Sequence, residues 1–335
     1  MTHAPHNSAN ERVLIAAFEG WSDAGAATTT VLQHLGELLN AEVLHVIGAD
    51  GFVDFQVHRP KVSFDENGRR QLEWPETRMY GTVHRPNSPI DASGPIGTAN
   101  PIGTDGSGNT DAPRVETIRR IDGTPVTDIF LLAGVEPARD WGAFAEEVVE
   151  LVDDWGIDSV ILIGSLFSDS PHSRPIVTTI SSDNANMRAR TGAERSDYEG
   201  PAGITTVLDL ALGEAGVPSL SLWAQVPHYV HSSPSPKATL AILDKLEELL
   251  DVVIPRGSLI DEANEWEANI DRIAATDEDM ASYIRSLEAA RDAATAPETT
   301  GEAIAHEFEK FLNIDPDSGL DGPSAGPTAG PNDIN

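Results

Sequence analysis

The sequence contains no cysteine, which excludes disulfides, thiolate nucleophiles and cysteine-ligated zinc. Cations are also scarce: 22 Lys and Arg stand against 54 Asp and Glu, for a formal net charge of −32. Such a chain repels phosphate backbones and anionic lipids, so neither nucleic acid nor a membrane is expected as a partner. No apolar run approaches the roughly 20 residues of a membrane span, and the polar residues 1–12 do not resemble a signal sequence. We therefore expect an acidic, cytoplasmic globular protein.

Complete catalytic motifs are missing as well. There is no phosphate-binding P-loop, and Ser165 lacks the flanking glycines of a nucleophile elbow. His306-Glu307 has no second histidine four residues further on, so it is not a zincin motif. The sequence accordingly predicts no metal site and no cofactor, and it does not specify a reaction.

Short apolar runs recur along the chain and indicate buried strands of a mainly parallel sheet; they lie at residues 13–18, 43–47, 129–133, 160–163 and 220–223. Segments of helical period separate them, at residues 24–40, 141–155, 203–215 and 236–250. Ser235 and Pro236 have the residue types of a helix N-cap and first turn. Strands that alternate with helices of this length predict a layered α/β fold.

Two regions depart from that alternation. Residues 51–85 carry aromatic and aliphatic side chains around the turn Asp65-Glu-Asn-Gly68, which predicts an antiparallel hairpin insertion. Residues 86–113 are rich in proline and glycine, and we expect a flexible insertion there. Residues 258–276 and 279–295 form a predicted helical hairpin. The expected organisation is an α/β domain over 12–255, a helical appendage over 256–295 and a disordered tail over 313–335.

Polar and aromatic side chains follow the ends of the predicted strands. Because parallel strands end at one edge of a sheet, these side chains are expected to share a rim. Glu19, Glu136 and His228 are the candidate catalytic residues; the rest of the rim comprises Trp21, Asp23, His172, Arg174 and Tyr229.

Each of these residues also has a structural interpretation. Asp23 sits where a helix N-cap belongs, and capping alone explains it. His172 and His228 are explained equally simply as hydrogen-bonded loop residues, and Trp21 by packing. For Glu19 and Glu136, which directly follow strands, both interpretations stay open.

Six segments occur in an order that resembles the proteasome assembly chaperone 2 family, in its actinobacterial branch: Phe18-Glu-Gly-Trp-Ser-Asp-Ala-Gly25, Val57-His-Arg-Pro60, Gly134-Val-Glu-Pro137, Pro171-His-Ser-Arg-Pro175, Gly200-Pro-Ala-Gly203 and Val226-Pro-His-Tyr229. The likeness runs from about residue 13 to residue 250. It implies a three-layer α/β sandwich similar to phosphorylase and peptidyl-tRNA-hydrolase-like domains, together with self-association into a homo-oligomer. Some relatives dock on the proteasome through a C-terminal hydrophobic-Tyr-any motif, whereas this sequence ends Asn332-Asp-Ile-Asn335.

Two hypotheses follow. The first, which the resemblance implies, is a non-enzymatic interaction protein of the proteasome-assembly-chaperone kind, whose protein partner the sequence does not name. The alternative is a small-molecule-binding protein, or a hydrolase-like or phosphorylase-like enzyme, that uses the rim at the strand ends. The fold type alone does not choose between them.

Overall fold

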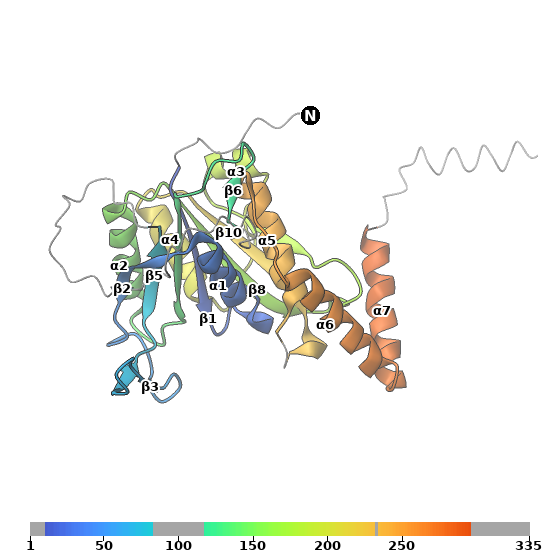
Figure 1. The fold of residues 1–335 in the computed structure, drawn as a ribbon. Coiled ribbons are helices and arrows are strands. Elements are labelled where there is room, and N and C mark those ends of the chain that lie inside the picture. The colour runs from blue at the N-terminus through green and yellow to red at the C-terminus, as the bar shows by residue number, and fades with distance from the viewer. Residues whose placement is uncertain (1–10, 83–116, 232–233, 296–335) are drawn as a thin grey trace, which may run out of the picture. The chain divides into compact units, whose positions relative to one another are not determined.

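The computed structural model describes residues 11–82, 117–231 and 234–295 (Figure 1). The chain divides into two compact units, residues 1–289 and 290–335, and the described part of the second unit is the end of one helix. The predicted insertion at 86–113 and the predicted tail at 313–335 lie outside the described residues. The predicted boundary between residues 255 and 256 stays a prediction.

The described strands are β1 (Val13–Glu19), β2 (Glu42–Ile47), β3 (Lys61–Phe64), β4 (Arg70–Glu73), β5 (Thr77–Gly81), β6 (Arg119–Arg120), β7 (Ile129–Val135), β8 (Ser159–Ser168), β9 (Thr178–Ser181), β10 (Ser219–Pro227) and β11 (Val252–Val253). The described helices are α1 (Ala27–Leu39), α2 (Trp141–Asp154), α3 (Ala185–Thr191), α4 (Ile204–Glu214), α5 (Pro236–Leu250), α6 (Leu259–Ala274) and α7 (Glu278–Thr295). Two short 3₁₀ turns, η1 (Ala24–Ala26) and η2 (His228–Val230), follow β1 and β10.

The main sheet has seven strands in the order β2-β5-β7-β1-β8-β10-β9. Its four central strands are parallel: β1 pairs with β7 on one side and with β8 on the other, and β10 pairs with β8. The flanking pairs β2–β5, β5–β7 and β9–β10 are antiparallel. The predicted mainly parallel α/β sheet is therefore confirmed.

Helices cover both faces of this sheet and complete the three-layer sandwich. Side chains alternate along β1, so that Val13, Ile15 and Ala17 pack with α1 and α5 while the residues between them pack with α2 and α4. Each face has its own apolar core cluster, and β7 and β8 contribute to both. A strand buried on both faces reads as a continuous apolar run, which is why these strands could be recognised in the sequence.

The predicted buried strand at residues 43–47 was placed wrongly. It is β2, an edge strand with Val43 and Val46 largely exposed. It pairs antiparallel with β5, which lies between β2 and the parallel strands. An apolar run identifies a strand but not its neighbours, and here the neighbour comes from a region that was predicted to be only a hairpin.

The hairpin itself is present as β3 and β4, which pair around the Asp65–Gly68 turn as a separate two-stranded sheet. The Asp65 carboxylate accepts hydrogen bonds from the backbone N–H groups of Asn67 and Arg69, which fixes the turn. At the other end of the chain α6 packs against α5, and α7 follows after a short turn. In the described ranges, none of the helices combines the length and apolarity needed to cross a bilayer.

Candidate functional site

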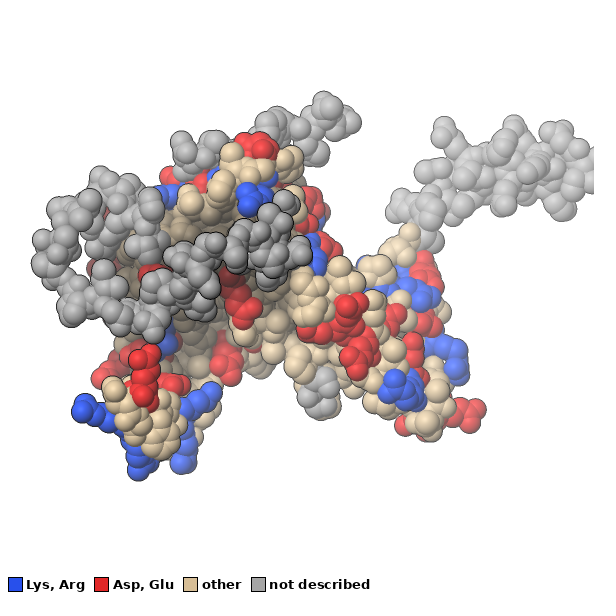
Figure 2. Space-filling view, in the orientation of Figure 1, with Lys and Arg blue, Asp and Glu red and all other residues tan. Residues whose placement is uncertain are grey.

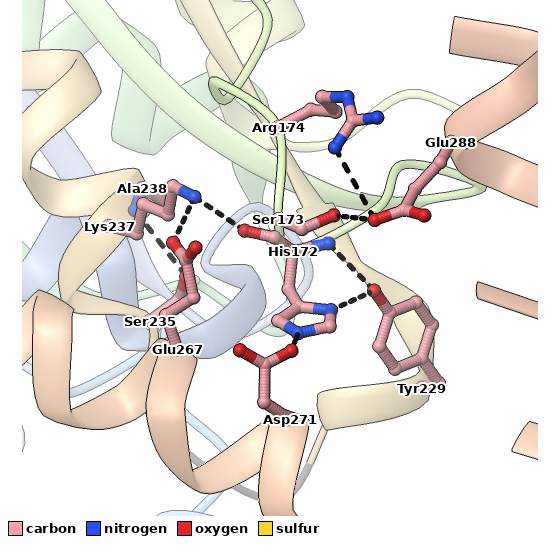
Figure 3. Close-up of polar contacts among 10 residues, drawn as sticks. All are labelled: His172, Ser173, Arg174, Tyr229, Ser235, Lys237, Ala238, Glu267, Asp271 and Glu288. Atoms are coloured by element: carbon pink, nitrogen blue, oxygen red, sulfur yellow. Dashed lines mark hydrogen bonds and ion pairs between the residues drawn. The ribbon is translucent and has the colours of Figure 1, made fainter. Parts of the chain in front are cut away.

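The parallel strands end at one edge of the sheet, as expected, but the eight rim residues form two groups there. Glu19, Trp21, Asp23 and Glu136 lie near the starts of α1 and α4. The other four, His172, Arg174, His228 and Tyr229, lie where loops meet α6 and α7 (Figure 3).

In the first group, Glu136 holds the start of α4. Its carboxylate accepts a hydrogen bond from the backbone N–H of Ile204, the first residue of that helix, at 2.9 Å. Gly203 supplies the space, because a Cβ there would lie 3.1 Å from the Glu136 carboxylate. A carboxylate at a helix N-terminus satisfies a free N–H group and interacts favourably with the helix dipole. Glu19 joins Glu136 through the main chain, its carbonyl accepting from the Glu136 N–H at 2.9 Å, while its side chain is exposed.

Asp23 holds the start of α1 in the same manner. Its carboxylate accepts hydrogen bonds from the backbone N–H groups and the hydroxyls of Thr28 and Thr29, at 2.6–3.2 Å. The chain kinks just before this helix because Gly25 has a φ of +62°. A Cβ on Gly25 would lie 2.9 Å from the Cβ of Ser235, so the kink requires glycine for space as well as for conformation. For this reason the helix begins at Ala27, three residues later than predicted.

We call the second group the His172 cluster; its members are His172, Ser173, Arg174, His228, Tyr229, Lys237, Glu267, Asp271, Tyr283 and Glu288. His172 is only 1% exposed and makes a polar contact on every side. Its ring Nδ1 lies 2.8 Å from the Tyr229 hydroxyl, and its Nε2 lies 3.1 Å from the Asp271 carboxylate of α6 (Figure 3). Its backbone N–H donates to the same Tyr229 hydroxyl at 2.7 Å.

One tautomer of His172 satisfies all these contacts. The Tyr229 oxygen accepts the backbone N–H of His172, so the Tyr229 O–H is free to donate to Nδ1 of the ring. The Nε2–H then donates to Asp271. We assign the Nε2–H donor to Asp271 and the Nδ1 acceptor to Tyr229 from the hydrogen-bond network.

The Tyr229 hydroxyl has a pKa raised to about 12. Burial is the main cause, and the negative charges of Glu288 and Asp271 add to it, while the hydrogen bond from the His172 N–H opposes it. A desolvated phenolate near carboxylates is unfavourable, so Tyr229 stays protonated at neutral pH and keeps its role as a donor.

Charged residues of α5, α6 and α7 complete the cluster, and none of them was among the predicted rim residues. Lys237, at the start of α5, donates to the backbone carbonyl of His172 and pairs with Glu267 of α6. Glu288 of α7 accepts from the Ser173 hydroxyl and lies 3.4 Å from the Arg174 guanidinium. These contacts attach α6 and α7 to the loop after β8.

His228 lies at the edge of the cluster. Its Nδ1 is 3.3 Å from both the Ser168 carbonyl and the Asp169 carboxylate, and its ring meets the rings of Tyr229 and Tyr283 edge-on at 5.7 Å. Tyr283 in turn donates to Asp169 at 3.3 Å. His228 is thus partly exposed but held by neighbours from three segments.

The expected convergence of Glu19, Glu136, His172 and His228 on one point stays a prediction. Glu19 and Glu136 are joined to each other, and both histidines contact Tyr229. Across the described ranges no hydrogen bond, ion pair or ring contact joins the first pair to the second. The same ranges hold no group of three His, Asp or Glu side chains arranged to bind a metal ion.

A groove of about 610 Å³ lies beside the His172 cluster. It runs between the loop that carries Ser173 and the exposed side of α5, and Ile176, Lys237 and Leu240 are among its lining residues. Glu19, Glu136 and His228 do not line it. This groove is therefore separate from the candidate catalytic residues.

Comparisons with known proteins connect the chain to one family. The sequence matches the PAC2 family over residues 17–274. It is 35% identical to a PAC2 family protein from Streptomyces avermitilis, with a TM-score of 0.65 and coverage of 81% of this chain and 98% of that chain. It is 32% identical to a proteasome-assembly chaperone homologue from Mycobacterium tuberculosis, with a TM-score of 0.62 and coverage of 81% and 99%.

A more distant similarity concerns the fold alone. An archaeal proteasome activator from Pyrococcus furiosus is 15% identical, with a TM-score of 0.54 and coverage of 79% of this chain and 93% of that chain. A search of functionally curated proteins found no match.

Proposed function

The chain belongs to the PAC2 family, and from this premise we propose that it is a non-enzymatic interaction protein that assists the assembly of proteasome subunits. The proposal takes its direction from the relatives, one of which is named a proteasome-assembly chaperone homologue. Within this chain, the proposal is supported by the hydrogen bonds that the rim side chains make to other parts of the fold.

One observation carries the proposal: the rim residues best suited to acid or base chemistry are engaged in holding the fold together. Glu136 and Asp23 cap the starts of two helices, and His172 is buried between Tyr229 and Asp271. A general base needs a reachable proton on a substrate, and a buried, fully hydrogen-bonded imidazole offers no such access. These rim side chains therefore connect segments of the fold, which supports a structural role over a catalytic one.

The alternative enzyme has less support on the same grounds. Of the three candidate catalytic residues, Glu19 and His228 keep exposed atoms, but they belong to different groups of contacts. A pair of catalytic groups must approach one reacting atom to within hydrogen-bond reach. Nothing in the described contacts brings these two together.

The test is an affinity purification from native lysate of the source organism, followed by quantitative mass spectrometry. The tagged chain is expected to enrich proteasome α and β subunits, in forms smaller than the finished particle. A lysate without the tagged chain provides the background. Retention of no protein beyond the chain itself would overturn the interaction role, and retention of other proteins without proteasome subunits would overturn the proteasome assignment.

A second measurement addresses the alternative directly. Wild type and the variants Glu19→Gln, Glu136→Gln and His228→Ala are heated with a panel of metabolites, and the unfolding midpoints are compared. The proposal expects no metabolite whose stabilising effect depends on these side chains. A metabolite that stabilises wild type but none of the three variants would favour the enzyme.

A further inference from the structure

The β3–β4 hairpin leaves an apolar face largely uncovered, although the ring of Trp74 at one end meets the ring of Phe55 at 5.1 Å. In its register Val62 lies opposite Leu72, and Phe64 lies opposite Arg70. Side chains alternate along a strand, so Val62, Phe64 and Leu72 share one face, and Trp74 continues the alternation. These four side chains are 51%, 67%, 53% and 43% exposed, respectively.

A two-stranded hairpin with such a face is not a self-sufficient unit. Isolated hairpins are at best marginally stable in water, and they become stable when an apolar face packs against something else. Large exposed apolar patches on a folded protein mark interaction surfaces. We therefore expect another protein surface to pack against the apolar face of the hairpin.

The charge of the hairpin differs from that of the rest of the chain. Residues 59–73 carry four cations and three carboxylates, a local net charge of +1 in a chain of net charge −32. The cations are Arg59, Lys61, Arg69 and Arg70, and all four are exposed. Figure 2 shows blue and red surfaces beside the tan surface of the hairpin, at the lower left of the view. Within the described ranges, no salt bridge engages any of them.

The outer side of α2 and α4 has the complementary character. The exposed carboxylates of α2 are Glu146, Glu147, Glu150, Asp153 and Asp154. Neither α2 nor α4 contains a lysine or arginine. The two helices contact each other and share an apolar seam, with Leu210 exposed and Val149, Val207 and Ala211 only partly buried.

We propose that the β3–β4 hairpin of one copy docks on the α2–α4 face of a second copy of this chain. The hairpin supplies exposed apolar side chains with four cations beside them, and the α2–α4 face supplies an apolar seam with five exposed carboxylates along α2. Most other contacts between two copies would bring like charges together, because each copy carries a net charge of −32. The cations of the hairpin give this contact an electrostatic attraction toward the carboxylates of α2.

This contact is head-to-tail, because it joins two different surfaces. A contact of this kind closes into a ring when its rotation allows, and otherwise it continues as an open chain of subunits. The proposal does not depend on a role in proteasome assembly, since a self-associating enzyme could use the same two surfaces.

The first test is the molar mass of the full chain in solution, measured by light scattering after size-exclusion chromatography. The double variant Phe64→Ser, Leu72→Ser is expected to raise the dissociation constant at least tenfold, because it removes two central apolar contacts. The matched control, Ser63→Ala with Gln71→Ser, changes the opposite face of the same hairpin and should leave the mass unchanged. Circular dichroism and the thermal midpoint check that each variant is folded.

The second test uses charge reversal at exposed positions, which leaves the fold intact. Arg69→Glu with Arg70→Glu on the hairpin, or Glu146→Arg with Glu150→Arg on α2, should each weaken self-association. Mixing the two variants should restore it, because each reversed hairpin then meets a reversed α2. Association of the wild type should also weaken as salt is raised.

Three outcomes would overturn the proposal. The first is a wild type that stays monomeric up to its solubility limit. The second is an oligomer that neither the Phe64→Ser, Leu72→Ser variant nor the charge reversals affect. The third is a Phe64→Ser, Leu72→Ser variant that lowers the thermal midpoint without changing the molar mass, because the face would then be covered by a segment of the same chain.

Discussion

Removing a single hydroxyl, that of Tyr229, tests whether the His172 cluster holds the later helices on the α/β core. In wild type this hydroxyl meets both the backbone N–H and the ring Nδ1 of His172, at 2.7 and 2.8 Å. The variant Tyr229→Phe keeps the ring and its packing but leaves both groups without their partner. Because His172 is 1% exposed, water does not replace the lost contacts.

The expected cost follows from those two groups. Each buried polar group left unsatisfied costs about 1–3 kcal/mol. With some relaxation of the loop, we expect Tyr229→Phe to lower the free energy of unfolding by about 3 kcal/mol. For a unit of this size, 1 kcal/mol corresponds to about 2–4 °C in the melting temperature, so the expected drop is about 6–12 °C.

Urea unfolding followed by tryptophan fluorescence measures the effect, and the cluster offers a matched control. Tyr283 also belongs to the cluster, but it is exposed and its hydroxyl donates only to the exposed carboxylate of Asp169, at 3.3 Å. Tyr283→Phe should therefore cost less than about 0.5 kcal/mol. If both variants shift the urea midpoint equally, the Tyr229 hydroxyl does not help to hold the later helices on the α/β core, and the reasoning is refuted.

Three further predictions concern pH, capping and close packing. Because burial raises the pKa of Tyr229 to about 12, against about 10 in the unfolded chain, its contribution to stability is complete below pH 10. That contribution is lost as the pH rises toward 12, and a pH series on Tyr229→Phe should lack this part of the decline. Asp23→Ala should lower the free energy of unfolding by about 1–2 kcal/mol in urea, and Asp23→Asn by less, because the amide oxygen still accepts. Gly134→Ala should destabilise by about 1–3 kcal/mol in calorimetry, since its Cβ would lie 2.3 Å from the Thr77 hydroxyl, whereas Gly142→Ala meets nothing within 4 Å.

Each of these predictions has a contrary result. An alkaline decline of equal size in wild type and Tyr229→Phe would mean that other groups cause it. Equal losses for Asp23→Ala and Asp23→Asn would mean that charge, rather than hydrogen bonding, stabilises the start of α1. Equal stability of Gly134→Ala and Gly142→Ala would mean that β5 can move away from β7 without cost.

The central strands and helices could be predicted because their sequence pattern reflects burial directly. A strand covered on both faces, such as β1, is a short unbroken apolar run, and the helices that cover it show apolar positions at helical spacing. The position of β2 could not be predicted in this way. Its neighbour β5 shows only one large apolar side chain that is fully buried, Met79, so nothing local marks it as part of the main sheet.

The location of the rim residues could be predicted from the sequence, but the residues that contact them could not. Residues that directly follow parallel strands must lie at one edge, which located Glu136 and the two histidines. Lys237 and Asp271, which contact His172, and Glu267, which pairs with Lys237, come from helices, where a charged residue is usually a solvated one. A weak signal existed, because Glu267 and Asp271 stand one turn apart and Glu267 is next to the buried Trp266. Spacing alone could not say which loop that side of α6 would meet.

The place of β1 in the sheet has a consequence for how the protein is made. It is the first of the described strands, yet both of its neighbours, β7 and β8, are encoded far downstream, with β7 beginning at Ile129. At about 5–20 residues per second, a ribosome needs on the order of ten seconds to reach them after finishing β1. During that interval the apolar β1 segment is unpaired. The centre of the sheet can form only after β7 and β8 have been synthesised. β1 is therefore synthesised well before it can be buried, and mutations that slow translation or expose this segment should appear first as losses in yield.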